Sequence, residues 1–291
     1  MIKQDDVNNS AGGFLTFLIQ SIVAMANDPK NNRFYLPRFL ADLKIDGDKT
    51  LVPYTTEMNM GEIASIKDQV SETLCNAAWA PLEGYDGAYA LTVPSLNITS
   101  VLINGLNNAF ISAYNVYPAN EQLQYAVVFD AVMNAYPDYD KLTFQPAEFY
   151  FDVTCQSTDK LHKEDIHSKG NFSGSVGQAT FKGVLLISLN DDLTTTVTVP
   201  ETYVVPQGAA MQGLGIVFGK DHGLVISDIT LEGDDPLKEY NEEAINQAFS
   251  NEDTLNKVQD LFNININIQS VRTTIASAVQ DKFNSLINDL K

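Results

Sequence analysis

Residues 263–290 read NININIQSVRTTIASAVQDKFNSLINDL, and the spacing of their apolar residues changes part of the way along. Up to Ile268, asparagine and isoleucine alternate, which predicts a brief extended segment. From Val271 onward, apolar residues return every three or four positions, which predicts an amphipathic helix over about 270–290. The change of period indicates strands before this point and a helix after it.

The predicted helix has two chemically distinct faces. Its apolar face consists of Val271, Ile275, Ala278, Val279, Phe283, Leu286, Ile287 and Leu290. Its polar face consists of Arg272, Ser277, Gln280, Asp281, Asn284 and Asn288. Such a stripe packs against other apolar surface. Either it forms part of an ordinary core, or it lines a cavity for an apolar ligand.

The region from about 89 to 232 follows a period of two, which is typical of strands with one buried face. Its longest alternating stretch is Phe172–Val205, where Asn190–Asp192 predicts a turn between the two arms of a long hairpin. Gly213–Gly219 and Leu224–Leu231 predict two further short strands. We therefore expect a long, twisted antiparallel sheet.

The first 82 residues are predicted to be helical. Phe14–Ala26 is an apolar helix of the mature fold, since the segment before it carries Lys3 offset by acidic residues, unlike a secretory signal. Asn59 and Glu62 resemble a capping box that starts a second helix. No apolar run reaches the ~20 residues that span a bilayer. We expect a soluble protein that is cytoplasmic or released by a non-classical route.

These segments predict one domain of the α+β class over residues 1–291. It comprises a helical N-terminal part (1–82), a β-rich part (89–232) and C-terminal helices (241–291). The sheet is expected to wrap around the C-terminal amphipathic helix.

The formal net charge of −19 excludes some partners. Nucleic acid and anionic membrane surfaces repel such a chain, and the basic residues of 30–49 are interleaved with aspartates. The most acidic stretch, Asp228–Asp260, serves either solubility or the binding of a cationic protein partner.

The sequence predicts no catalytic site, cofactor or metal. His162 and His167 are expected in a polar loop and His222 in a hairpin turn. Acidic pairs such as Asp234–Asp235 match no calcium-binding loop and are typical of turns. The two cysteines, Cys75 and Cys155, are either buried thiols or one disulfide. We therefore predict that the protein is not an enzyme.

Several short segments carry a family resemblance, namely LTVPSLNI (91–98), INGLNNA (103–109), GNFSGSVG (170–177), ISDITL (226–231) and the helix Val271–Leu290. With the expected order of a helix, long twisted hairpins, a short strand and a terminal amphipathic helix, they resemble the tubular lipid-binding superfamily, which includes bactericidal/permeability-increasing proteins, juvenile-hormone-binding proteins and accessory proteins of clostridial neurotoxin clusters. The resemblance implies a lipid or other hydrophobic ligand, or membership of a toxin-associated complex. The helical first 80 residues and the lack of a secretion signal depart from the family, and no family motif carries functional residues over.

Three functions follow from these patterns. The first is non-enzymatic binding of a lipid or hydrophobic small molecule. Its candidate residues, all from one helical face, are Val271, Ile275, Val279, Phe283 and Ile287. The second is a β-pore-forming or toxin component, because the Ser/Thr-rich alternation of Phe172–Val199 is typical of a membrane hairpin. The third is a structural or protein-interaction module without a ligand.

Overall fold

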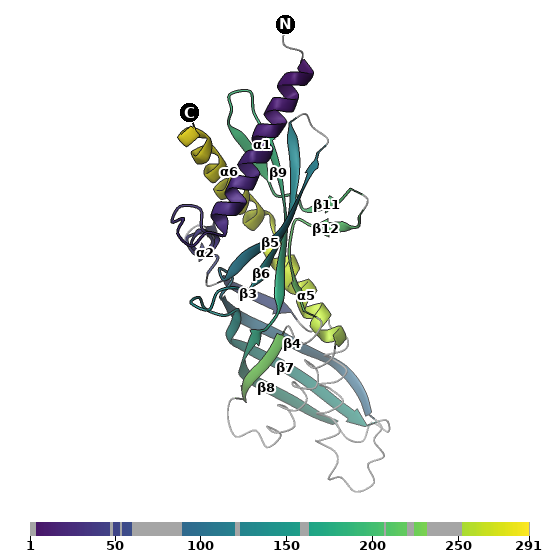
Figure 1. The fold of residues 1–291 in the computed structure, drawn as a ribbon. Helices are drawn as coiled ribbons and strands as arrows, with labels where there is room; N and C mark the ends of the chain where they lie inside the picture. The colour runs from purple at the N-terminus through teal and green to yellow at the C-terminus, as the bar shows by residue number, and fades with distance from the viewer. Residues whose placement is uncertain are drawn as a thin grey trace.

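A computed structural model describes residues 4–46, 49–52, 54–59, 89–119, 123–157, 163–206, 208–219, 224–231 and 252–290. It confirms the predicted α+β fold, with a helix at the N-terminus, antiparallel sheet in the middle and helices at the C-terminus (Figure 1). The helices are α1 (Gln4–Ala26), α2 (Leu36–Ala41), α5 (Glu252–Ile266) and α6 (Gln269–Leu290).

The strands of the described residues form two five-stranded antiparallel sheets and two small ribbons. The proximal sheet, near both chain termini, contains β5 (Ala109–Pro118), β6 (Gln124–Met133), β9 (Ala179–Leu189), β10 (Thr195–Thr198) and β13 (Leu214–Phe218). The distal sheet contains β3 (Tyr54–Asn59), β4 (Tyr89–Asn104), β7 (Thr143–Ser157), β8 (Lys163–Val176) and β14 (Leu224–Leu231). The ribbons are β1 (Lys44–Asp46) with β2 (Lys49–Thr50), and β11 (Thr202–Val204) with β12 (Ala210–Gln212).

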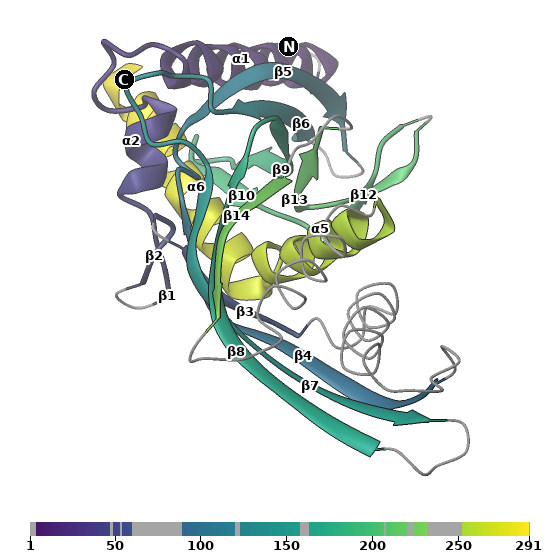
Figure 2. The same cartoon turned by 90° about the horizontal axis from the view of Figure 1, so that it is seen from below.

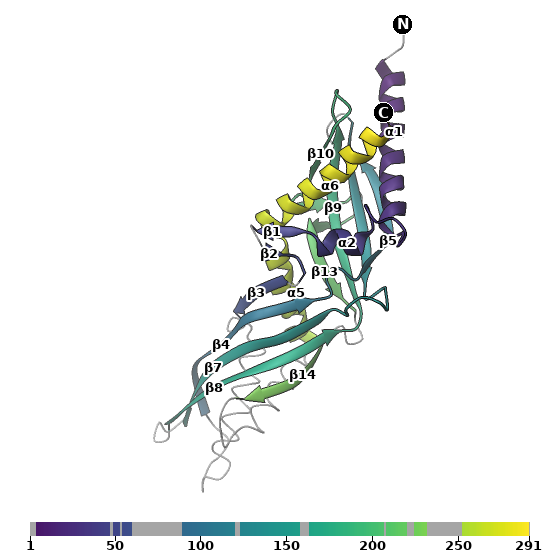
Figure 3. The same ribbon diagram turned by 90° about the vertical axis from the view of Figure 1, so that its left-hand side faces the viewer.

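The two sheets are arranged end to end (Figure 3). Across the proximal sheet the strand order is β13-β9-β6-β5, and across the distal sheet it is β14-β8-β7-β4, followed by β3. Apart from β10, each proximal strand is therefore adjacent in the chain to the distal strand at the same place in the order. The predicted long sheet is one run of strands that is divided in two by a line of turns, which we call the seam.

Two asparagines hold the seam together. The side chain of Asn108, which is 1% exposed, donates to the carbonyls of Tyr136, Tyr139 and Asp140 and accepts from the Tyr136 amide. Asn134, at a φ of 57°, donates to the Val176 carbonyl and accepts from the Leu142 amide. These amides replace the ladder hydrogen bonds that the turns interrupt.

The outer edge of the proximal sheet is shared by two strands. β9 pairs with β13 along its first half and with β10 along its second half, both antiparallel. Between these two strands the chain leaves the sheet and forms the β11–β12 ribbon. The edge strand is therefore split, and its outward-facing backbone groups require partners from another element.

Side-chain amides of the C-terminal helices provide those partners. Five backbone amides of the edge donate to side chains of α5 and α6 or of the turn between them. The pairs are Phe218 to Gln259, Ile216 to Asn263, Leu214 to Asn267, Val197 to Gln280 and Thr195 to Asn284. Asn263 also donates to the Ile216 carbonyl, at 2.9 Å.

The spacing of these amides matches the geometry of the two elements. Four helical residues rise about 6 Å, and two strand residues rise about 6.6 Å. Gln259, Asn263 and Asn267 are four residues apart, and their partners on β13 are two residues apart. We call this set of contacts the amide ladder. It aligns α5 and α6, which meet at an angle in Figure 2, along the edge.

The opposite edge of the proximal sheet is bound in the same way. Asn27, directly after α1, donates to the Ile111 carbonyl of β5 at 2.8 Å and accepts from the Ile111 amide at 3.0 Å. Because β5 is the edge strand there, helices are tied to both edges of this sheet.

The extended segment predicted for residues 263–268 is wrong, because α5 continues to Ile266. Asparagine and isoleucine alternate here for a reason other than strand formation. Asn263 and Asn267 reach the sheet edge, Phe262 and Ile266 are buried, and Ile264 is 59% exposed. Tertiary hydrogen bonds and helical packing thus override the local alternation.

Other predictions need correction or fall outside the described residues. Asn59 ends strand β3 rather than starting a helix, and the rest of that predicted helix lies within 60–88, outside the described residues, as does Cys75. His167 lies in strand β8, not in a loop, whereas His162 and His222 are not among the described residues. The predicted turn at Asn190–Asp192 is confirmed, but its first arm folds into two strands, β8 and β9, in different sheets.

We expect Asn108→Ala to lower the free energy of unfolding by about 2–4 kcal/mol, because it leaves several seam backbone groups without partners. Urea unfolding measures this loss. Asn115→Ala, at an exposed site on β5, is the matched control and should stay within ~0.5 kcal/mol of the wild type. Equal stability of the two variants would contradict the role given to Asn108.

Asn263→Ala tests the amide ladder. It removes both hydrogen bonds to Ile216 and should destabilise the protein by about 1–3 kcal/mol. Asn288→Ala, on the exposed face of α6, has the same gain in helix propensity without an edge contact. If the Tm of Asn263→Ala is equal to or higher than that of Asn288→Ala, the ladder does not stabilise the fold.

Candidate functional site: an apolar cavity between the proximal sheet and its helices

One face of the proximal sheet is apolar and is covered by helices. On β6 the residues Val127, Phe129 and Ala131 share this face, and on β9 Phe181, Leu185 and Ile187 do so. Direct pairing across the strands keeps them together, since Phe129 lies opposite Gly183 and Ala131 opposite Phe181. The period of two seen in the sequence thus produces one continuous apolar surface.

The helices do not fill the space over this surface completely. A cavity of about 150 Å³ remains between the sheet and α1, α2 and α6. Ile19 and Val23 of α1 and Phe39 of α2 line it, together with the sheet residues above. Among the described residues that line the cavity, only Lys282 is not apolar.

The structure brings together four of the five predicted ligand-binding residues. Val271, Ile275, Val279 and Phe283 of α6 all line the cavity. Ile287, one turn further along, is only 2% exposed and belongs to the core, but it does not line the cavity. The helical spacing therefore identified the wall that α6 contributes.

The other walls were not predicted residue by residue. The lining residues of β6 and β9 follow the alternation in the sequence, but that pattern does not indicate which strands face α6. Those from α1 lie within the apolar segment Phe14–Ala26, which was predicted as a helix without a place in the fold. Their location depends on tertiary structure.

A glycine makes room for an aromatic side chain at the floor of the cavity. A β-carbon at Gly183 would lie 2.3 Å from the Phe129 ring, so the ring occupies the place of the missing side chain. The same ring lies 6.1 Å from that of Phe181, centroid to centroid. Phe129, Gly183 and Phe181 together shape this part of the apolar surface.

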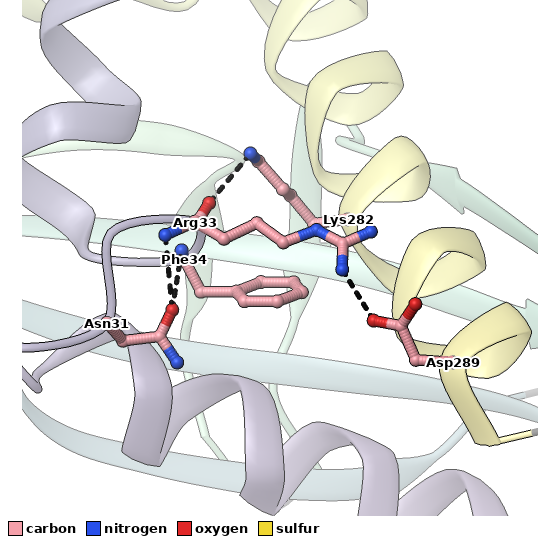
Figure 4. Close-up of polar contacts among 5 residues, drawn as sticks. All are labelled: Asn31, Arg33, Phe34, Lys282 and Asp289. Atoms are coloured by element: carbon pink, nitrogen blue, oxygen red, sulfur yellow. Dashed lines mark hydrogen bonds and ion pairs between the residues drawn. The ribbon is translucent and has the colours of Figure 1, made fainter.

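Lys282 lies at the rim of the cavity, and Figure 4 shows its contact with the backbone of Arg33. Its Nζ donates to the Arg33 carbonyl at 2.8 Å and lies 5.7 Å and 5.9 Å from the ring centroids of Phe34 and Phe39. Cation–π attraction holds an ammonium in such a position. The loop that supplies the carbonyl is fixed by Asn31, whose Oδ1 accepts from the amides of Arg33 and Phe34.

The size of the cavity limits its contents. Its 150 Å³ equals that of an engineered apolar cavity in another protein, which stays dry and binds benzene or xenon. Pockets for drug-sized ligands are larger, at about 300–1,000 Å³. The cavity therefore accommodates a benzene-sized group or about six carbons of a hydrocarbon chain.

Three tyrosines near α2 form a packing cluster. Burial is the main cause that raises the pKa of Tyr35, whose ring meets those of Tyr136 and Tyr139 edge-on at 5.6 Å and 6.1 Å. Burial also raises the pKa of Tyr136. Both phenols therefore stay neutral at physiological pH and act as packing groups.

In the described part of the chain, no group of three or more His, Cys, Asp or Glu side chains is placed to hold a metal ion. None of the described helices is long and apolar enough to cross a membrane. The sequence also matches no protein-family model and no curated protein.

Phe283→Ala tests the packing around the cavity. Phe283 is 2% exposed, so its truncation should enlarge the void and lower the free energy of unfolding by about 3–5 kcal/mol. Leu290→Ala, in the same helix but at a site that is 54% exposed, should change it by less than ~1 kcal/mol. Urea unfolding compares the two, and a similar small loss in both would show that Phe283 is not a core residue.

Proposed function

We propose that the protein binds a lipid or another hydrophobic small molecule without catalysing a reaction on it. The observation that carries this proposal is the apolar cavity beside α6. Its surface has the chemistry of a hydrophobic ligand site, and among the described lining residues the one charged group, Lys282, stands at its rim.

The energy of an empty cavity supports the proposal. Protein interiors are close-packed and contain few voids larger than a water molecule. At about 24 cal/mol per Å³, an unfilled void of 150 Å³ costs roughly 3–4 kcal/mol. Water that enters the cavity recovers little of this free energy, because the walls offer it almost no hydrogen-bonding partners. An apolar ligand restores the missing contacts and recovers part of this energy.

The arrangement of the fold is a second support. A long antiparallel sheet bent at a seam, with an amphipathic terminal helix on its apolar face, fits the architecture implied by the resemblance to the tubular lipid-binding superfamily. We therefore propose membership of that superfamily together with the binding function.

Thermal unfolding with 1-octanol, a neutral single-chain amphiphile, tests the proposal. At ten times its Kd, a ligand of the folded state adds about 1.4 kcal/mol of stability, which raises the Tm by a few degrees. We expect this rise in the wild type. We expect a much smaller rise in Val279→Phe, because the larger side chain fills the cavity from α6.

The control is Val132→Phe, which makes the same change on the other face of β6, at a residue that is 40% exposed. It should respond to octanol like the wild type. If octanol leaves the Tm of the wild type unchanged, and native mass spectrometry of the purified protein shows no bound apolar molecule, the ligand-binding function is wrong. The protein-interaction function would then take its place.

A further inference from the structure

An open polar depression of about 770 Å³ adjoins the apolar cavity. Phe39 and Lys282 line both spaces, so the two meet at these side chains. The cavity and the depression together form a site with an apolar end and a polar end.

The polar end is rich in cations. Arg33, Arg38, Lys44 and Lys282 line the depression, together with the two carboxylates of Asp42 and Asp281. This excess of positive charge contrasts with the net charge of −19 for the whole chain. The local field therefore favours an anion at a place where the rest of the protein repels one.

Several of these cations are available to a ligand. Arg33 forms an ion pair with Asp289, and Arg38 donates to the Asn32 side chain at 2.7 Å. Among the described residues, no carboxylate forms an ion pair with Arg38, Lys44 or Lys282. The Lys282 ammonium has three N–H donors, and the Arg33 carbonyl accepts from it. The remaining donors can bind an anionic oxygen.

From these contacts we propose that the ligand is a single-chain anionic amphiphile, namely a fatty acid. Its hydrocarbon tail lies in the apolar cavity, and its carboxylate lies at Lys282, facing the depression. This inference rests on the proposed ligand-binding function. The cavity volume favours one short chain over a diacyl lipid, since it holds about six carbons. A charge-assisted hydrogen bond at the rim then fixes the carboxyl end.

Calorimetric titration with octanoate and 1-octanol separates the contributions of head and tail. Both have eight carbons, so about six fill the cavity and the head reaches the rim. We expect the wild type to bind octanoate at least ~10-fold more tightly than octanol. Lys282→Met should weaken octanoate binding by about 10-fold and octanol binding much less, so that the preference for octanoate is lost, whereas Lys282→Arg should retain the preference.

Lys257→Met is the matched control, because it removes the same charge from an exposed site on α5 and should leave both affinities unchanged. Octanol binding by Lys282→Met shows that this variant is folded. If wild type binds octanol and octanoate equally, the fatty-acid inference is wrong, but the ligand-binding function stands. If octyl phosphate binds more tightly than octanoate, the carboxylate assignment is also overturned. If none of the three binds, the proposed function itself fails.

Discussion

The hydrogen bonds between amide side chains and the edges of the proximal sheet determine how the helices lie. An edge strand presents unpaired N–H and C=O groups that either bind water or recruit another strand. Here Asn27 pairs with both backbone groups of Ile111 at one edge, and Asn263 does the same with Ile216 at the other. The helices are thereby fixed at both margins of one sheet face, with the apolar surface between them.

This arrangement explains why α6 borders a cavity instead of packing flat on the strands. Successive helical residues are about 100° apart, so the row that contains Gln280 and Asn284 faces the edge of β10 while the adjacent row, Val279 and Phe283, faces the apolar sheet surface. The hydrogen bonds to the edge set the distance of the helix from the strands. The side chains of α1 and α6 then approach each other without filling the space between them, and Lys282 completes the rim.

The sequence predicted the elements with long, regular patterns and failed where tertiary contacts decide the conformation. The stripe from Val271 to Leu290 identified α6, and its members Val271, Ile275, Val279 and Phe283 form a wall of the cavity, because residues at helical spacing share one face. The asparagines after Phe262 were misread as a strand, because their four-residue spacing from Gln259 has meaning only beside a strand edge. Gly183 gave no signal either, since its role depends on a ring from a neighbouring strand. The contacts of the asparagines with the sheet edge and of Gly183 with Phe129 each join residues from two segments. The sequence of either segment alone therefore does not reveal them.

The central claim is that the helices tied to the sheet edges enclose a site for an apolar chain. Nuclear Overhauser effects between the protons of bound octanoate and assigned protein methyl groups test it most directly. The account predicts contacts from the ligand chain to Ile19 of α1, Leu185 of β9 and Val279 of α6, which belong to three different elements around the cavity. Contacts confined to exposed side chains such as Ile264 and Leu290, with none to these three, would contradict it.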